Sequence, residues 1–416
     1  MTRDNYNLYL DLRDKIEAGQ SDNFSPAEAE LIEKLQYGSF VFPGQHDEIE
    51  ELHFNHNMAR YDKTILNLSF APTMACNMAC TYCYEGIKKG RMSPEVIEHI
   101  VNFVRERAPG TKELDIAWFG GEPLLAMEII EKLTDSFLDL QKQFKFSYTA
   151  MIITNGYLLN RENVDRLSDL KVQAAQVTLD GPARMHNKKR PLMNGAGSFE
   201  RIIENIKYAV EKMRISIRVN IDKSFSPEIM AEMLQELDRA GLRDKVGINF
   251  GHLEALTSTC SNIAESCYNI AEFSKAEVAY YNLFLQSGFM IGKLPLPSQI
   301  TCISQSVNAF LIDPEGRMFK CFAKLGDPSK AMGYIGDKIE YNNENFTGLF
   351  RFDPFLDEDC RRCNILPVCL GGCPEKRTNP DFGKEECCVS WKHNLEPMLE
   401  IIAHSRQQQN ADAERS

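Results

Sequence analysis

The chain has 416 residues, of which 43% are hydrophobic and 25% charged, a composition typical of a folded protein with two or three domains. Its formal net charge is -12 and it has no basic stripe, which argues against nucleic acid as a partner. No run of eighteen apolar residues occurs and the first residues are polar and acidic, so we expect no membrane span and no signal peptide. We therefore expect a cytoplasmic location, in which thirteen cysteines favour metal binding over disulfides.

Residues 1–64 have the pattern of a small, separate α+β unit. Residues 7–12 and 39–42 fit short strands, and residues 25–35 fit a helix with Ser25 as its N-cap and Pro26 in its first turn. An acidic helical stretch follows from Asp47. Two interpretations stay open for this unit: a packing appendage or a binding module.

From residue 65 onward, short apolar runs alternate with helical patterns. The predicted strands are 65–70, 114–119, 146–154, 174–179, 214–221 and 246–250. The predicted helices are 94–107, 127–144, 162–170, 199–213, 227–240 and 275–286. Six strand–helix units predict a parallel sheet, two units short of a closed eight-stranded barrel. The expected fold class is therefore α/β, a partial (β/α)6 TIM-like barrel over 65–292, with the chemistry at the carboxyl ends of its strands.

The C-terminal part has a different composition. Periodicity weakens over 293–398 while cysteine, glycine and proline rise, so we expect a cysteine-rich domain held by metal sites instead of a large apolar core. Residues 399–416 are predicted to be a polar tail, disordered from Gln407 onward.

Three cysteines follow the first predicted strand directly: Cys76, Cys80 and Cys83. A cubane iron–sulfur cluster takes thiolate ligands, and three of them leave the fourth iron open, as a catalytic metal requires. The C-x3-C-x2-C spacing, with Tyr82 before the third cysteine, resembles the signature of the radical S-adenosylmethionine (SAM) superfamily. The resemblance implies that these cysteines hold a [4Fe–4S] cluster that cleaves SAM, with Tyr82 near the adenine.

The loops after the later strands extend this resemblance to SAM binding. Gly120, Gly121 and Glu122, after the second strand, are similar to the family's motif that binds the methionine amino group of SAM. The Glu122 carboxylate can accept a hydrogen bond from that group. The competing interpretation of this segment is a simple turn.

Further along, Thr178 matches a ribose-contacting position, and Arg190 matches an arginine that pairs with the methionine carboxylate. The competing interpretations are a packing residue at the strand end and a solvated loop charge. Residues 154–156 either approach the cofactor or merely end the third strand. We assign His186 no catalytic role, because a lone loop histidine is more often a structural donor.

A second group of cysteines has a more specific spacing: Cys302-x13-Gly316-x4-Cys321, then Cys360-x2-Cys363-x5-Cys369-x3-Cys373, then the doublet Cys387 and Cys388. This spacing resembles the SPASM domain of peptide- and protein-modifying radical SAM enzymes. The resemblance implies two auxiliary [4Fe–4S] clusters, and so three clusters in all. It assigns Cys302, Cys321 and Cys373 to the first, and Cys360, Cys363 and Cys369 with Cys387 or Cys388 to the second. The first lacks an obvious fourth ligand, so another cysteine supplies it or the position is open for substrate. Zinc is the competing interpretation.

The resemblance implies an enzyme that reductively cleaves SAM to a 5′-deoxyadenosyl radical. Our leading hypothesis is a maturase that forms a thioether in a ribosomally made precursor peptide. Its partners would be that peptide, whose leader the N-terminal unit would bind, and a reducing partner such as a flavodoxin or ferredoxin. The alternatives are carbon–carbon crosslinking of a peptide, anaerobic sulfatase maturation by formylglycine formation, and a non-enzymatic zinc or iron–sulfur scaffold. No catalytic acid or base can be singled out.

Overall fold

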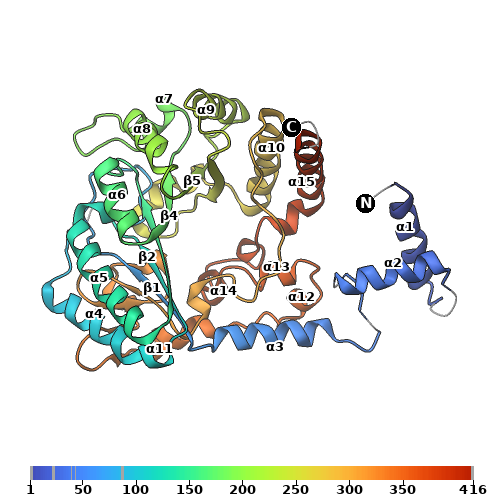
Figure 1. Ribbon diagram of the computed structural model, residues 1–416, viewed down its shortest axis with the longest axis horizontal. Coiled ribbons are helices and arrows are strands. Elements are labelled where there is room, and N and C mark those ends of the chain that lie inside the picture. The colour runs from blue at the N-terminus through green and yellow to red at the C-terminus, as the bar shows by residue number, and fades with distance from the viewer. Residues whose placement is uncertain (1–2, 21–23, 39, 43, 86–88, 414–416) are drawn as a thin grey trace. The chain divides into compact units, whose positions relative to one another are not determined.

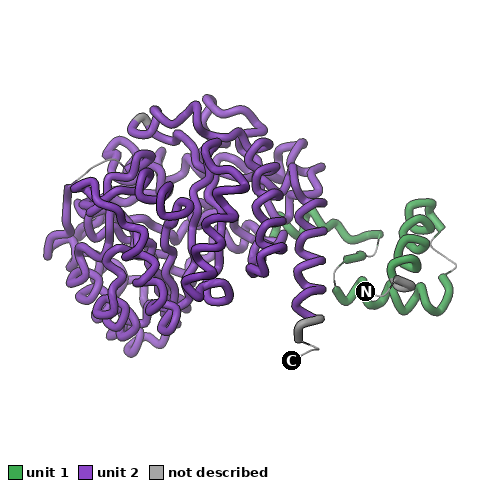
Figure 2. Tube along the Cα trace, turned by 90° about the horizontal axis from the view of Figure 1, so that it is seen from above, with its two compact units in different colours: residues 1–54 green, residues 55–416 purple. Residues whose placement is uncertain are grey.

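The structure is a computed structural model that describes residues 3–20, 24–38, 40–42, 44–85 and 89–413. The chain divides into two compact units, residues 1–54 and 55–416 (Figure 2). The division lies earlier than the predicted boundary at residue 64, because helix α3 (Glu48–Arg60) continues from the first unit into the second.

The first unit is helical, not α+β. It contains α1 (Arg3–Glu17), α2 (Pro26–Tyr37) and the start of α3. The predicted N-cap is confirmed: Ser25 and Glu28 form a capping box at the start of α2. The predicted strand at 7–12 is wrong and lies within α1, because its leucines Leu8 and Leu12 also share one helix face and Leu12 is buried there. No strand occurs at 40–42 either, and Ser39 lies outside the described residues.

The second unit contains the predicted parallel sheet. Six strands lie side by side in chain order and pair in parallel: β1 (Ile65–Phe70), β2 (Glu113–Trp118), β3 (Ser147–Thr154), β4 (Val172–Thr178), β5 (Arg214–Ile221) and β6 (Val246–His252). The sheet ends at β6 on one side and does not close on itself, as expected for a partial barrel.

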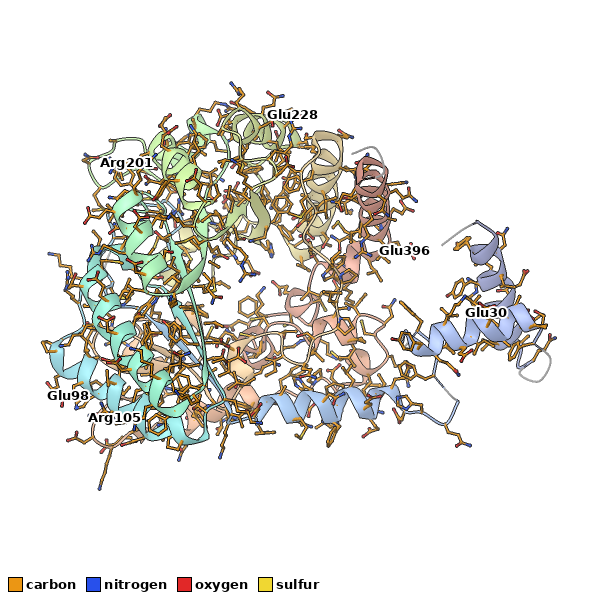
Figure 3. The ribbon with its side chains drawn as sticks, viewed as in Figure 1. Glu30, Glu98, Arg105, Arg201, Glu228 and Glu396 are labelled. Carbon is orange, nitrogen blue, oxygen red and sulfur yellow. The ribbon has the colours of Figure 1, made fainter. Side chains whose placement is uncertain are left out.

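Helices cover the outer side of these strands (Figure 1). They are α4 (Pro94–Arg107), α5 (Met127–Phe144), α6 (Arg161–Asp169), α7 (Ala183–Lys189), α8 (Phe199–Ala209), α9 (Pro227–Arg239) and α10 (Ile270–Ser287). Their outer faces carry charge, as Glu98, Arg105, Arg201 and Glu228 illustrate (Figure 3). Their inner faces and the strands form one hydrophobic core. In this core, the ring centres of Phe70 and Trp118 lie 5.4 Å apart. Among the α-helices that the structure describes in this region, the short α7 is the one that the sequence did not predict.

The cysteine-rich region is built onto the same sheet. Strand β7 (Ala309–Ile312) pairs in parallel with β1, and β8 (Arg317–Phe319), β9 (Gly333–Tyr334) and β10 (Glu340–Tyr341) follow antiparallel. Phe310 and Ile312 belong to the main core, so apolar packing joins the start of this region to the sheet, while the role of metal sites in the rest stays a prediction. Short helices complete the region: α11 (Asn343–Thr347), α12 (Glu358–Arg361), α13 (Leu366–Cys369) and α14 (Pro374–Thr378).

The chain ends in a long helix, α15 (Trp391–Ala413), where we predicted a disordered tail. The helix packs against α10, and Asn394 donates to the buried carboxylate of Glu277 at 2.9 Å. Met398, Ile401 and Ile402 join the core, so apolar contacts order a segment whose end is polar. Among the described residues, no helix is long and apolar enough to cross a membrane.

Candidate active site

The three cysteines of the first motif lie on the loop after β1, at the carboxyl end of the sheet. Burial raises the pKa of Cys76 to about 12 and also raises that of Cys80, and both thiols interact with the nearby Arg190 charge. Such thiols hold their protons at neutral pH, and metal binding displaces those protons. The side-chain amide of Asn155 lies 3.8 Å from the Cys76 sulfur, where it can donate a hydrogen bond.

Gly120 and Gly121 let the loop after β2 lie directly on the cysteine loop. A Cβ on Gly120 would lie 2.7 Å from the Thr73 carbonyl oxygen, and one on Gly121 would clash with the Ala75 carbonyl oxygen. The close approach is fixed by backbone hydrogen bonds: Gly121 N–H donates to Thr73 at 3.2 Å, and Glu122 N–H donates to Ala75 at 2.9 Å. The glycines therefore position the cysteine loop through its backbone.

Glu122 is completely buried and joins the ends of β2 and β3. Its carboxylate accepts the Thr154 hydroxyl at 2.8 Å, the Asn155 N–H at 2.8 Å and the Leu124 N–H at 3.1 Å. Burial raises its pKa, and these hydrogen bonds counteract the rise by stabilising the ionised form. The segment 154–156 thus both ends β3 and reaches the cysteine loop through Asn155.

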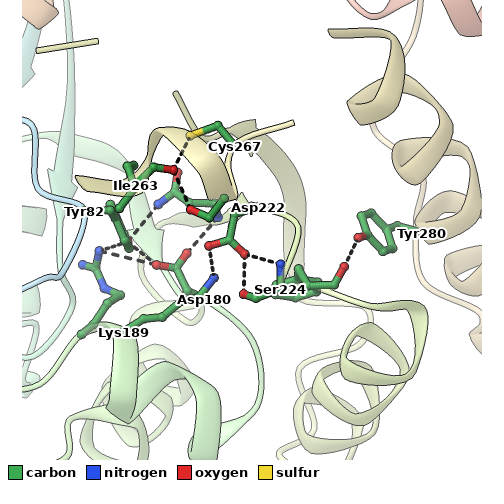
Figure 4. Close-up of polar contacts among 12 residues, drawn as sticks. Tyr82, Asp180, Lys189, Asp222, Ser224, Ile263, Cys267 and Tyr280 are labelled. Carbon is green, nitrogen blue, oxygen red and sulfur yellow. Dashed lines mark hydrogen bonds and ion pairs between the residues drawn. The ribbon is translucent and has the colours of Figure 1, made fainter. Parts of the chain in front are cut away.

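Tyr82 lies in a polar network with Asp180 (Figure 4). Arg190 belongs to the same network through its hydrogen bond to the Tyr82 hydroxyl. The Tyr82 hydroxyl donates to the Asp180 carboxylate and accepts from Arg190 Nη1 at 2.7 Å and from Asn220 Nδ2 at 3.1 Å. The second Asp180 oxygen accepts the Asn220 N–H at 2.8 Å, and Arg190 lies 3.9 Å from Asp180. Arg190 is only 7% exposed, so the structure does not support the alternative of a solvated loop charge.

His186 holds the backbone around Arg190. Its Nδ1 accepts the Asp180 N–H at 3.1 Å, so its proton lies on Nε2, which faces the Ser198 hydroxyl at 3.1 Å. Ser198 in turn donates to the Arg190 carbonyl at 2.9 Å. Burial and the Arg190 charge lower the His186 pKa well below 6.5, so this ring is neutral and structural, in agreement with the sequence interpretation.

Thr178 ends β4 and is buried, opposite Arg218 of β5 in the sheet register. It lies at the same edge of the sheet as the cysteine loop, where the ribose role that the resemblance implies stays a prediction.

Three cysteines of the second group form one set: Cys302, Cys321 and Cys373. Burial raises the pKa of Cys321 to about 12, and its charge interactions include Glu375, Cys302 and Cys373. Cys373 likewise interacts with Cys302. The structure therefore brings together the three residues that the resemblance assigns to the first auxiliary cluster.

A buried lysine accompanies this set. Lys320 is 4% exposed and precedes Cys321 in the chain; its amine donates to the carbonyls of Ser306 at 2.6 Å and Ala309 at 2.7 Å. Its Nζ also lies 4.7 Å from the centre of the Phe310 ring, and within the described residues no carboxylate pairs with it. Burial lowers the pKa of Lys320 to about 7, and a thiolate-ligated cluster beside it would favour its charged form.

A second set lies around Arg377 and consists of Cys360, Cys363, Cys369 and Cys388. The Nη2 of Arg377 lies 3.9 Å from the Cys360 sulfur and 3.8 Å from the Cys388 sulfur. Cys369 interacts electrostatically with Cys388, and Lys392 interacts with both Cys388 and Cys363.

Cys387 has different surroundings from its neighbour in the doublet. Its thiol donates to the Gly383 carbonyl at 3.3 Å, and its own carbonyl accepts the Cys373 N–H at 3.3 Å. This contact requires a glycine at position 372, where any Cβ would clash with the Cys387 carbonyl. Arg377 also interacts electrostatically with Cys387, but its Nη2 lies 3.8 Å from the Cys388 sulfur, so Cys388 fits the second set better.

In the described ranges, no three His, Cys, Asp or Glu side chains converge closely enough to hold a single metal ion. Cubane thiolates bind different irons and need no such convergence.

Residues 70–237 match the radical SAM superfamily. These residues are a radical SAM domain. The chain is 24% identical to a cysteine-type anaerobic sulfatase-maturating enzyme of Clostridium perfringens, over 82% of this chain and 99% of the relative. The solved structure of native anSMEcpe with bound AdoMet has a TM-score of 0.63 at 20% identity, covering 84% and 99% of the two chains. SuiB of Streptococcus suis, bound to the precursor peptide SuiA, has a TM-score of 0.57 at 15% identity, covering 90% and 88%.

The chain is therefore an enzyme with a radical SAM domain at 70–237, and its C-terminal cysteines fit a SPASM domain. The superfamily implies SAM and a [4Fe–4S] cluster as cofactors. One observation tests the fit of SAM to the residues present: Arg190 Nε is buried and, in the part of the chain that the structure describes, has no hydrogen-bond partner. A carboxylate such as that of methionine would satisfy this donor.

The sequence did not predict the contacts of Tyr82 with Asp180 and Asn220. For residues 154–156 it left two interpretations open, and Asn155 lies close to the Cys76 sulfur. Asp180 and Asn155 lie in strand-end segments that the motif search singled out, but their partners come from other loops. Asn220 and Arg377 carried no local signal.

Proposed function

We propose that this radical SAM enzyme is a maturase that oxidises a side chain of a peptide substrate, and that its product is a thioether crosslink. When bound, the reduced cluster and SAM supply a 5′-deoxyadenosyl radical that removes a hydrogen atom from an unactivated C–H bond. The protein's task is to orient SAM and the target bond and to exclude water.

The observation that carries the thioether proposal is the first auxiliary set. Three thiols, Cys302, Cys321 and Cys373, lie together, and a cavity of about 720 Å³ borders Cys321. A cubane bound by three protein thiolates keeps one iron open, and a substrate cysteine is the soft ligand that this iron would take. Glu375 and Arg377 also line the cavity, so an incoming peptide would meet polar groups.

The proposed reaction balances with two electrons leaving the substrate. One C–H bond and one S–H bond break, and one C–S bond forms. One hydrogen atom leaves from carbon, the thiol proton passes to solvent, and the remaining electron passes to an auxiliary cluster. An external reductant, such as a flavodoxin or ferredoxin, supplies the electron that starts each turnover.

In the SAM pocket, Arg190 would bind the methionine carboxylate with its free Nε edge. The other edge is already held, because Nη1 donates to Tyr82 and Tyr82 is fixed by Asp180. Such a clamp orients the ligand without reorganising on binding.

Formylglycine formation on a sulfatase is the second candidate. It is supported by the similarity to an anaerobic sulfatase-maturating enzyme along 99% of that relative. The starting chemistry would be the same, but a cysteine would exchange its sulfur for oxygen and also lose two hydrogens.

Mass spectrometry separates the two candidates. The reconstituted enzyme would be incubated with SAM, a reductant and either the cysteine-containing peptide encoded beside its gene or a sulfatase peptide. A thioether predicts loss of two hydrogens and of one alkylatable thiol. Loss of two hydrogens with every thiol still alkylatable excludes the thioether and favours a carbon–carbon crosslink. Exchange of sulfur for oxygen in the sulfatase peptide supports formylglycine formation.

A further inference from the structure

Arg377 is a charged residue that contacts two thiols of the second cysteine set. It lies on α14, which begins directly after Cys373. Its Nε donates to the Gly371 carbonyl at 2.7 Å, and its guanidinium lies over the Phe352 ring at 5.0 Å. These two contacts fix the plane of the guanidinium and direct its Nη2 toward the thiols of Cys360 and Cys388.

Because one nitrogen reaches two sulfurs from different segments, the contact does more than neutralise charge. Cys360 lies in α12, whereas Cys388 lies after the end of α14, and Arg377 Nη2 lies 3.9 Å from the first sulfur and 3.8 Å from the second. Guanidinium hydrogen bonds to thiolates stabilise the more negative state of a cluster, and that state is the reduced one.

The other charges near this set are weaker candidates. Lys392 reaches Cys388 at 3.6 Å but is exposed, so solvent screens it. The Asp357 carboxylate lies near Cys360, but it accepts the Cys360 N–H at 3.0 Å and faces Lys384 at 3.8 Å.

We propose that Arg377 raises the reduction potential of the auxiliary cluster held by Cys360, Cys363, Cys369 and Cys388, and thereby makes this cluster the favoured acceptor of the substrate's electron. The proposal rests on the proposed function and on the presence of two auxiliary clusters. Arg377 is in this account a positioning residue, because it acts through the thiolates.

The test is an EPR-monitored redox titration of the full chain with Cys76, Cys80 and Cys83 replaced by alanine, so that only auxiliary clusters remain. In R377Q, the equilibrium constant for one-electron reduction of one cluster should fall at least tenfold, about 59 mV. The signal of the other cluster should keep its potential. K392Q, the matched control, should change the constant less than about threefold because its charge is screened.

The conservative variant R377K keeps the charge but loses the planar set of N–H donors of the guanidinium. The reduction potential of its cluster should therefore lie between those of the wild type and R377Q. If R377Q fails to retain the cluster, R377K decides: a potential equal to the wild-type value would overturn the proposal. So would an R377Q chain with full iron content and an unchanged potential. A missing second signal in the chain with Arg377 intact would instead refute the two-cluster proposal.

Discussion

Cys387 and Cys388 are adjacent in the chain but have different partners. The Cys387 thiol donates to the Gly383 carbonyl at 3.3 Å. The Cys388 thiol lies 3.7 Å from the Lys384 carbonyl and also contacts Arg377 Nη2 and Lys392 Nζ. The sequence left the two residues equivalent, because spacing alone cannot tell which of two neighbours points to a distant group. The direction of the backbone decides which thiol faces Arg377. The close approach of Gly372 to the Cys387 carbonyl fixes that direction.

We expect the replacement of Cys388 by alanine to remove one auxiliary cluster, about four irons per chain, because the cubane loses a ligand. The replacement of Cys387 by alanine should leave the iron content near the wild-type value. Iron, sulfide and zinc analysis after anaerobic reconstitution checks both. Equal loss of iron in the two variants, or stoichiometric zinc, would contradict the assignment.

His186 gives a prediction about pH. Its folded-state pKa lies well below 6.5, whereas the unfolded chain takes up a proton near 6.5. The unfolded state therefore binds more protons below this pH, and the free energy of unfolding falls as the pH drops through that window. In the apoprotein, the thermal midpoint should drop more between about pH 7.5 and about pH 5.5 for the wild type than for H186N. Equal drops would contradict a buried neutral histidine.

The roles of Tyr82 and Arg190 could be anticipated only in part. The motif resemblance predicted both residues, but it placed Tyr82 near the adenine and gave no partner for it. Their actual contacts, with Asp180 and Asn220, join residues up to 138 positions apart in the chain. Such pairs depend on how strand ends meet in space, which a local pattern does not contain.

At the scale of elements, the strands and helices of the barrel were predicted well because strict periodicity and helix caps mark them. The strands β1 and β5 and the helices α4 and α5 have the predicted bounds. Strand β7 was missed because it is four residues long and pairs with β1, more than 230 positions earlier in the chain. The helical N-terminal unit was misjudged because a short alternation of leucines fits both the two-residue period of a strand and the 3.6-residue period of a helix.

The close approach of the β2 loop to the cysteine loop gives a prediction at this scale. In G121A, the new methyl group would displace the Ala75 backbone, so the first cluster should be lost and SAM cleavage with it. In G247A, whose Cβ would meet nothing within 4 Å, cluster content should be unchanged. Iron analysis of the two variants, in chains lacking the auxiliary cysteines, measures this. A G121A chain with full iron content would show that the glycine is dispensable.

For the whole molecule, the division into two units predicts that the first is separable from the chemistry. We propose that it binds the leader of the substrate, and it exposes Tyr37 and Phe40, aromatic side chains suited to peptide contacts. A chain starting at His46, which keeps Asp47 as the cap of α3, should still cleave SAM but modify the peptide poorly. Substrate mass spectrometry and 5′-deoxyadenosine assays measure the two activities. Full peptide modification by the truncated chain would show that the unit is a packing appendage.

The central claim is that Cys76, Cys80 and Cys83 hold the cluster that cleaves SAM. Its most direct measurement is chromatography for 5′-deoxyadenosine after anaerobic reconstitution and reduction, with SAM added. The account predicts 5′-deoxyadenosine from the wild-type chain and none from C80A, whose auxiliary clusters stay intact. A fully reconstituted wild-type chain that forms no 5′-deoxyadenosine, or a C80A chain that forms as much as the wild type, would contradict it.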